Sequence, residues 1–210
     1  MKKIILSSFL SLLGIILVFL IFLSTVGIQT DKFNKQISSQ VKNFDENIEI
    51  FLKDVNIIFE PLKFQFNVKT LGTKLKYDEI IIDLESIKSQ ISLKNIINNK
   101  FSLTHLNVST KLLDIGNLIS FIRLIEDNSQ LFFLEKIIKK GSLVADINLQ
   151  FDENGKVKEN YNIVGFTKDI KINFLKKENL EKIDFIFDFK KDEYLFKDTS
   201  FLINKQKVSL

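Results

Sequence analysis

Side chains that could do acid–base, thiol or metal chemistry are few in this sequence. His105 is the only histidine, and the chain has no cysteine. A lone imidazole could act as a general base, but it needs a nucleophile within reach, and none is identifiable around the run LTHLNV. One histidine cannot build a multi-histidine metal site, and the lack of cysteine excludes disulfides, thiolate nucleophiles and Cys-ligated metals. Thiol and metal chemistry are therefore not expected.

Catalytic sequence motifs are also lacking. The sequence has no P-loop, no G-x-G-x-x-G, no G-x-S-x-G and no H-E-x-x-H pattern. Residues 152–155 lack the ligand spacing and the distal glutamate of a calcium loop. Carboxylates are abundant, but several are expected on water-facing sides of strands, namely Asp83, Asp146, Asp184 and Asp188. We therefore predict that the protein is not an enzyme and has no catalytic residue, cofactor or metal site.

The charge distribution argues against a nucleic-acid partner. The chain has 30 Lys and Arg against 26 Asp and Glu, which gives a net charge of +4. Nucleic-acid binding usually needs a clustered basic face. Only short basic pairs occur, such as Lys139-Lys140, Lys176-Lys177 and Lys190-Lys191. With 45% hydrophobic and 27% charged residues, the chain is expected to fold as a globular domain.

The first hydrophobic run extends from Ile4 to Leu23 without a charged residue. A helix rises about 1.5 Å per residue, so about 20 residues cross a hydrocarbon core of about 30 Å. We predict a transmembrane helix over residues 4–26. Residues 1–3 are expected in the cytoplasm, because Lys2 and Lys3 precede the span.

Two alternatives to a retained membrane anchor are disfavoured. A signal peptide could be cleaved near Thr25-Val26-Gly27, but the apolar run exceeds the roughly 7–15 residues of a signal core, and no A-x-A site is present. With either an anchor or a signal peptide, the downstream domain is exported. A buried core helix is the other alternative, but its polar and small residues are too few and too scattered to form a wet face: Ser7, Ser8, Ser11 and Gly14.

Residues 27–46 are expected to form a linker and a short amphipathic helix. Phe33, Ile37, Val41 and Phe44 recur at helical spacing, and Thr30 could cap the helix. This helix could pack on the domain, or it could lie in the headgroup layer of the membrane. Packing on the domain is the favoured alternative.

From residue 47 onward the hydrophobic period changes to two. Such alternation places one row of side chains on an apolar face and the next in water. Residues 47–210 are therefore expected to form an exported, β-rich domain of antiparallel strands with one wet face. The later predicted strands cover residues 157–166, 170–175, 183–189 and 194–203.

Turn and helix signals interrupt these strands. Asn154-Gly155 predicts a hairpin turn, because both residues tolerate positive φ, and Pro61 separates the first strand pair. A helical insertion is expected at about 114–140, with Asp114 as its cap and Gly141 as its stop. Two apolar helical stripes in this segment predict a helical hairpin that covers one end of the sheet.

Phenylalanine is unusually frequent, with 21 residues. Many lie at the apolar positions of the alternating runs. Such a face could be the core of an ordinary sandwich or of a sheet covered by helices, or it could stay open as a groove for acyl chains. The residues that would contact lipid in the second case are Phe64, Phe66, Val68, Leu143, Ala145, Ile147, Leu149, Phe151, Ile183, Phe185, Phe187 and Phe189.

The order of elements resembles the N-terminal part of the AsmA-like group of envelope proteins, which includes the TamB and YhdP types. An N-terminal span, a linker with a helix, and strands interrupted by a helical pair follow one another along essentially the whole chain. The matched positions are Gly27, Thr30, Phe33 and Asn34 in the linker, and Phe151, Asp152, Gly155 and Gly165 around the predicted hairpin.

This resemblance implies a mainly β fold with an N-terminal transmembrane helix and a curved antiparallel sheet, a β-groove or half-barrel with the helical hairpin inserted or capping. It implies a single-pass inner-membrane protein whose bulk is periplasmic and which moves phospholipid along an apolar groove toward the outer membrane. The expected partners are the membrane, phospholipid acyl chains and envelope proteins. An anchored structural protein that assists outer-membrane protein assembly is the alternative.

The chain is shorter than members of that group usually are. Ten strands at about 4.8 Å spacing reach only about 50 Å, which does not bridge two membranes. The sequence also stops within the strand-like run LINKQKVSL. We therefore expect the domain at 47–210 to be truncated at its C-terminal end.

Overall fold

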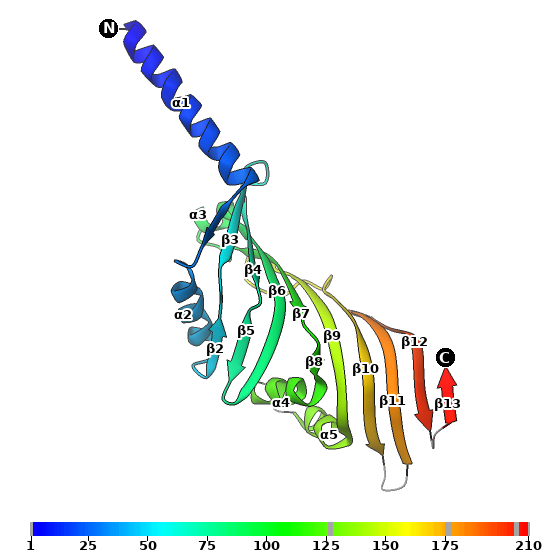
Figure 1. Ribbon diagram of the computed structural model, residues 1–210. Helices are drawn as coiled ribbons and strands as arrows, with labels where there is room; N and C mark the ends of the chain where they lie inside the picture. Colours follow the sequence, from blue (N-terminus) through cyan, green and yellow to red (C-terminus); the bar gives the residue numbers. More distant parts are fainter. Residues whose placement is uncertain (1, 126–127, 175–177, 204–205, 210) are drawn as a thin grey trace.

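The apolar N-terminal helix projects away from the rest of the protein. The computed structural model describes residues 2–125, 128–174, 178–203 and 206–209 (Figure 1). In it, α1 covers Lys2–Thr25, and the segment Ile4–Thr25 is long and apolar enough to cross a membrane. The most apolar window of that segment is not buried by the described part of the chain. This helix is therefore not the core helix of a globular domain.

Gly27 makes the turn between α1 and the sheet. The amides of Val26 and Gly27 both donate to the carbonyl oxygen of Phe22, at 2.9 and 3.2 Å. Gly27 has a φ of +72°, and a Cβ there would lie 2.6 Å from the carbonyl oxygen of Ile57. Only glycine fits this left-handed and crowded position. Strand β1 (Ile28–Thr30) follows at once and pairs with β3, so α1 is joined to the sheet without a free linker.

The remainder of the described chain is dominated by one 13-stranded antiparallel sheet (Figure 1). Its order is β1-β3-β4-β6-β7-β9-β10-β11-β12-β13, with β2 beside β5, β5 also beside β6, and β8 beside β9. In the described ranges β1 and β13 do not pair, so the sheet is open. The other strands are β2 (Ile48–Phe51), β3 (Val55–Glu60), β4 (Gln65–Leu71), β5 (Lys74–Tyr77), β6 (Ile80–Ser92), β7 (Leu103–Thr110), β8 (Leu113–Asp114), β9 (Ile138–Gln150), β10 (Asn162–Phe174), β11 (Glu178–Lys190), β12 (Glu193–Ile203) and β13 (Gln206–Ser209).

On the α1 side of the sheet, two neighbouring lines of strand are each interrupted by a short break, one between β4 and β5 and the other between β2 and β3. β4 and β5 both pair with β6, and the short break between them holds Gly72 and Thr73. The Thr73 side chain is fully buried, and its hydroxyl lies 3.0 Å from that of Thr70. β2 and β3 are interrupted at the matching place, where Asn34 Nδ2 donates to the carbonyl oxygens of Leu52 and Lys53, at 3.2 and 2.6 Å.

Asn34 should therefore be important for stability. Asn34→Ala removes both hydrogen bonds and should lower the free energy of unfolding by about 1–2 kcal/mol. Asn34→Asp should lower it further, because a carboxylate has no donor and would face two carbonyl oxygens. Chemical unfolding in detergent, followed by circular dichroism, measures the free energies of unfolding of the unaltered protein and of the two variants. An aspartate variant as stable as the unaltered protein would contradict this account.

Within the residues that the structure describes, four helices accompany the sheet. They are α2 (Asn34–Phe44), α3 (Leu93–Ile97), α4 (Ile115–Ile125) and α5 (Ser129–Ile137). The prediction that Thr30 caps α2 is wrong. Thr30 belongs to β1, its hydroxyl accepts from the Lys32 amide at 3.1 Å, and the residue before the helix, Phe33, makes no side-chain cap. Pairing of Thr30 with Val55 in β3 holds it away from the helix start.

The predicted helical insertion begins as expected and ends earlier. Asp114 Oδ1 accepts from the Asn117 amide at 2.9 Å, which caps α4. The prediction that the insertion reaches residue 140 and that Gly141 stops it is wrong, because α5 ends at Ile137 and β9 begins at Ile138. Gly141 instead lies inside β9 with a φ of +145°, and a Cβ there would lie 2.9 Å from the Cα of Ile170.

The β9–β10 connection is longer than the predicted two-residue hairpin. The Asp152 carboxylate accepts from the amides of Asn154 and Lys156, both at 2.9 Å, so a turn forms at the expected place. Beyond it only an isolated bridge joins Phe151 and Val157. The predicted strands at 157–166 and 170–175 are therefore wrong in extent. Regular pairing starts at residue 162, and one strand, β10, continues from the first segment into the second as far as Phe174, while residue 175 lies outside the described residues.

Strands β10, β11 and β12 each carry a bulge next to that of the neighbouring strand. Asp169, Lys182 and Asp198 have φ angles of +53°, +51° and +50°, and the register shifts beside each of them. Bulges bend a strand and increase its local twist. A row of bulges across neighbouring strands therefore bends the sheet along a line.

The protein core lies between the sheet and the helices. One cluster joins Phe121 of α4 to residues of β2, β5, β6 and β8: Ile48, Tyr77, Ile82, Leu84 and Leu113. A second cluster joins Ile115 and Ile119 of α4 to Ile170 and Ile183 of β10 and β11. Both clusters lie on one face of the sheet, so α4 covers the ends of these strands that lie far from α1 (Figure 1).

Candidate functional site

One register row of the sheet is apolar across eight strands. Residues in this row pair successively from β3 to β12, and seven of the eight are hydrophobic or aromatic. The exception is Thr70, whose hydroxyl contacts that of Thr73. We call this set the apolar row: Val55, Thr70, Ile87, Val108, Ile147, Ile163, Phe189 and Tyr194. Seven strand spacings of about 4.8 Å give the row a length of about 34 Å.

The adjacent register row is polar without exception. We call it the polar row: Asn56, Lys69, Lys88, Asn107, Asn148 and Asn162. Within it, Asn107 Nδ2 donates to Asn148 Oδ1 at 2.6 Å. Successive residues of a strand point to opposite faces. Along these two rows, the sheet is therefore apolar on one face, which we call the apolar face, and polar on the other, which we call the polar face.

Ten of the twelve sequence-predicted contact residues lie on the apolar face. Side chains two residues apart in a strand point to the same face. Phe66, Val68, Ile147 and Leu149 therefore lie on the same face as the apolar row. The aromatic residues of β11 lie on this face too: Phe185, Phe187 and Phe189. Phe64 and Phe151 lie outside the regular strands: Phe64 is in the β3–β4 turn with a φ of +51°, and Phe151 is in the isolated bridge. The ten are Phe66, Val68, Leu143, Ala145, Ile147, Leu149, Ile183, Phe185, Phe187 and Phe189.

Some of these ten residues are covered by the protein itself. Leu143 and Ile183 pack against Ile115 and Ile119 of α4. Ala145 is also buried. In the apolar row, Ile87 and Val108 pack against the cluster that contains Phe121 of α4, whereas the part of the row from Ile147 to Tyr194 belongs to neither of the two clusters that contain α4 residues.

An apolar pocket of about 440 Å³ lies where β3, β4 and β6 approach α1. Phe66 and Val68, two of the residues that the sequence placed on the apolar face, line it. Phe19 and Leu23 of α1 also line it, and no sequence signal indicated that the end of the span would meet the sheet. The complete lining is apolar: Phe19, Leu23, Ile28, Phe33, Ile37, Val55, Ile57, Phe59, Phe66, Val68, Ile91 and Ile96. We call this the α1 pocket.

Aromatic rings gather at the other end of the apolar row. Phe196 lies 5.4 Å from both Phe185 and Phe189, measured between ring centroids, and Phe187 stacks on Phe189 at 5.0 Å. Phe196 is 54% exposed and Tyr194 is 67% exposed, so this aromatic cluster is open to solvent at β12. Sequence reasoning missed both residues as contacts, although their place in the alternating run 194–203 could have indicated them.

A glycine makes room for the aromatic cluster. Gly165 of β10 pairs with Ala145 on one side and Phe187 on the other. A Cβ on Gly165 would lie 2.5 Å from Phe187 Cζ and 2.1 Å from the carbonyl oxygen of Val144. The Phe187 ring therefore occupies the space that a side chain at Gly165 would fill.

A small polar network holds α5 against α4. Ser120 Oγ donates to Glu135 Oε1 at 2.8 Å, and Arg123 forms an ion pair with the same carboxylate. The hydrogen bond from Ser120 and the charge of Arg123 lower the pKa of Glu135. Arg123 also lies 5.0 Å from the centre of the Phe132 ring. The network ties the two helices together.

This contact should weaken in acid. The folded-state pKa of Glu135 lies below its unfolded value, so its stabilisation is complete above the unfolded pKa. It is lost as the pH falls through the lowered folded value. The protection factors of α5 amides, which correct for the intrinsic pH dependence of hydrogen exchange, should therefore fall in that acid range. In Glu135→Gln this acid-dependent fall should disappear, and an unchanged fall would show that Glu135 is not its source.

The polar side chains that could take part in acid–base or metal chemistry lie outside the apolar row. His105 lies on the polar face of β7, between Gln90 of β6 and Gln150 of β9. The Asp184 carboxylate accepts from the Asp169 amide at 2.7 Å, which supports the β10 bulge. Within the described ranges, no group of three or more His, Cys, Asp or Glu could hold a metal ion.

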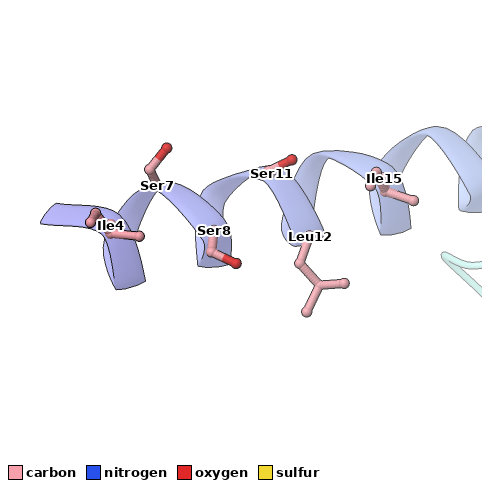
Figure 2. Close-up of a pocket in the computed structure, with 6 residues that line it drawn as sticks. All are labelled: Ile4, Ser7, Ser8, Ser11, Leu12 and Ile15. Carbon is pink, nitrogen blue, oxygen red and sulfur yellow. The ribbon is translucent and has the colours of Figure 1, made fainter. Parts of the chain in front are cut away.

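A shallow depression on α1 also carries polar side chains. Figure 2 shows it on a single helix, with the hydroxyls of Ser7 and Ser11 on one side and Ser8 on another. Ile4, Leu12 and Ile15 complete its lining. It contains no charged group and lies inside the segment that is apolar enough to cross a membrane, so it is not a plausible site for a reaction.

The apolar face, with the α1 pocket at one end and the aromatic cluster at the other, is thus the candidate functional site. Comparisons with known proteins found no family model, no curated protein and no solved structure that matches the chain.

Proposed function

We propose that this protein is a membrane-anchored lipid-transfer module whose apolar face is a groove for phospholipid acyl chains. The observation that carries the proposal is the apolar row, which extends from the α1 pocket to the exposed aromatic cluster. The row runs about 34 Å across one face of an open sheet. It is buried at Val55 and exposed at Tyr194, and exposed apolar patches generally mark a binding surface.

Acyl chains match this surface in chemistry. Each methylene group buried from water is stabilised by about 0.8 kcal/mol, so tails lying along the row would recover much of the free energy lost on leaving the bilayer. Headgroups would remain in water at the open side of the groove. The part of the apolar row from Ile147 to Tyr194, which lies outside the clusters that contain α4 residues, would carry the tails past α4 and α5.

The α1 pocket supports membrane entry as the start of the path. Phe19 and Leu23 belong to the helix that could span the membrane, and they share the pocket with Phe66 and Val68 of the sheet. A tail leaving the bilayer beside α1 would meet apolar side chains at once. The exposed residues Tyr194 and Phe196 would pass it on at the other end. Diffusion along such a surface needs no covalent step.

The same arrangement and the resemblance to AsmA-like proteins support a proposal about the cellular setting. We propose that α1 is a retained single-pass anchor in the inner membrane of a diderm bacterium, with residues 1–3 in the cytoplasm and the sheet in the periplasm. The groove would carry phospholipid from the inner toward the outer membrane, as part of a longer assembly that includes further envelope proteins.

Lipid transfer from reconstituted vesicles tests the function. The full chain is inserted into donor vesicles that contain self-quenched fluorescent phospholipid, and acceptor vesicles without label are added. Transfer should be faster than between protein-free vesicles, and it should respond to substitutions on the apolar face only. A rate equal to that of protein-free vesicles would contradict the proposal.

A further inference from the structure

The end of the sheet beside α1 carries apolar side chains that are exposed to solvent. Leu62 in the β3–β4 turn is 98% exposed, and Ile97 in α3 is 69% exposed. Phe64 and Ile96 are about half exposed beside them. We call these four residues the apolar tip. Fully exposed leucine and isoleucine side chains are unfavourable in water, and four in two neighbouring segments form a surface patch.

The apolar tip is one structural unit. The Leu93 amide at the start of α3 donates to the carbonyl oxygen of Phe64 at 3.1 Å, which joins α3 to the β3–β4 turn. Ser92 Oγ caps α3 by accepting from the Asn95 amide, at 3.2 Å. The rings of Phe59 and Phe64 pack edge to face at 6.4 Å. The positions of Leu62 and Ile97 are therefore held by the sheet.

The position of the apolar tip along the axis of α1 indicates the environment that surrounds the tip. Ile96 and Phe59 line the α1 pocket together with Phe19. Phe19 lies six residues before the end of α1 at Thr25, or about 9 Å along the helix axis. β3 runs onward from Phe59 into the turn that contains Leu62, beside the last turns of α1 (Figure 1). If Phe19 is in the membrane, the tip is at the same level.

Basic side chains accompany the apolar ones. Lys63 lies next to Leu62 and pairs with Glu60 at 2.8 Å, and Lys94 lies in α3. Lysine can keep its ammonium group at the headgroup level while its stem lies along apolar surface. An apolar tip that is flanked by lysine and lies beside a helix able to span the membrane is suited to insertion into a lipid leaflet.

We infer that the apolar tip inserts into the membrane leaflet from which α1 emerges, as a second and peripheral contact between the sheet and the bilayer. This contact fixes the orientation of the sheet relative to the membrane surface and holds the α1 pocket open toward the lipid tails. The inference depends on α1 crossing the membrane, and it does not depend on lipid moving along the groove.

The lack of cysteine in the chain allows a direct test. Leu62→Cys is labelled with an environment-sensitive fluorophore in the full chain, reconstituted in phosphatidylcholine and phosphatidylglycerol vesicles. Glu79→Cys, in the exposed β5–β6 turn at the opposite end of the sheet, is the matched control. The Leu62 label should emit at shorter wavelength and be quenched several-fold more strongly by nitroxide lipids than the Glu79 label. Iodide should quench only the Glu79 label.

Equal iodide quenching at both positions would overturn the inference. Because Leu62 has almost no contacts in the protein, its substitution should not disturb folding, and a labelled Ile97→Cys chain gives an independent reading. If both labels are in water while vesicle-to-vesicle transfer is still observed, the tip inference alone fails. If the labels are in lipid while transfer is absent, the proposed function alone fails.

Discussion

Replacing Ile147 by aspartate should slow phospholipid transfer about tenfold or more, which corresponds to about 1.4 kcal/mol. Ile147 lies at the centre of the apolar row, between Val108 and Ile163. A carboxylate there must either lose its hydration when a tail passes or keep water in the groove, and both are unfavourable for the lipid. The measurement is the rate of fluorescent lipid transfer between vesicles.

Asn148→Asp is the matched control for this experiment. It introduces the same charge one residue away, on the polar face, and its oxygen can still accept from Asn107 Nδ2. Transfer by this variant should stay close to that of the unaltered protein. Circular dichroism of both variants checks folding. If the two variants transfer lipid equally well, the apolar row is not the path of the lipid.

Replacing Gly165 by alanine should destabilise the fold by about 3 kcal/mol or more. The new Cβ would lie 2.1 Å from the carbonyl oxygen of Val144 and 2.5 Å from Phe187 Cζ. The first atom belongs to the backbone of the neighbouring strand, so β9 and β10 would have to separate. Loss of the Phe187 position would also disturb the aromatic cluster. Chemical unfolding in detergent measures the effect.

Gly72→Ala provides the comparison for Gly165→Ala. Gly72 has a φ of +60°, but nothing lies within 4 Å of a Cβ placed there. The backbone strain alone should lower stability by about 1 kcal/mol. The difference between the two variants isolates the effect of crowding at Gly165. Equal losses of stability would mean that β9 and β10 relax without strain.

The alternation of residue types predicts which side chains share a face. Ile147 and Leu149 alternate with Asn148 and Gln150, and the structure places these pairs on opposite faces because the side-chain period of a strand is two. Asp114 likewise indicates the start of α4, because its carboxylate can reach an amide three residues on. Such local signals depend only on neighbouring residues.

The bulges and the end of the helical insertion were not predictable in this way. Lys182 adopts a positive φ although lysine has no preference for it, because pairing with β10 and β12 imposes the shift. Gly141 followed two lysines and had the pattern of a helix stop, yet close contact with Ile170 requires it inside β9. Neighbouring strands decide these conformations, and the local sequence does not contain that information.

The candidate site could likewise be predicted only in part from the sequence. Phe66 and Phe189 could be assigned to one apolar face from alternation within their own strands. Phe19 and Leu23 could not be assigned to the α1 pocket, because only the turn at Gly27 and the pairing of β1 with β3 bring α1 to the sheet. That α4 covers Leu143 and Ile183 is also a tertiary contact.

Photo-crosslinking from two phenylalanine positions tests the central claim most directly. Phe196 lies on the apolar face and Phe166 on the opposite face two strands away, and they are 54% and 44% exposed. Each is replaced by benzoyl-phenylalanine in the full chain, reconstituted with radiolabelled phospholipid and irradiated. A groove for acyl chains predicts that position 196 captures phospholipid and position 166 does not. Equal capture at both positions, or capture at position 166 alone, would contradict it.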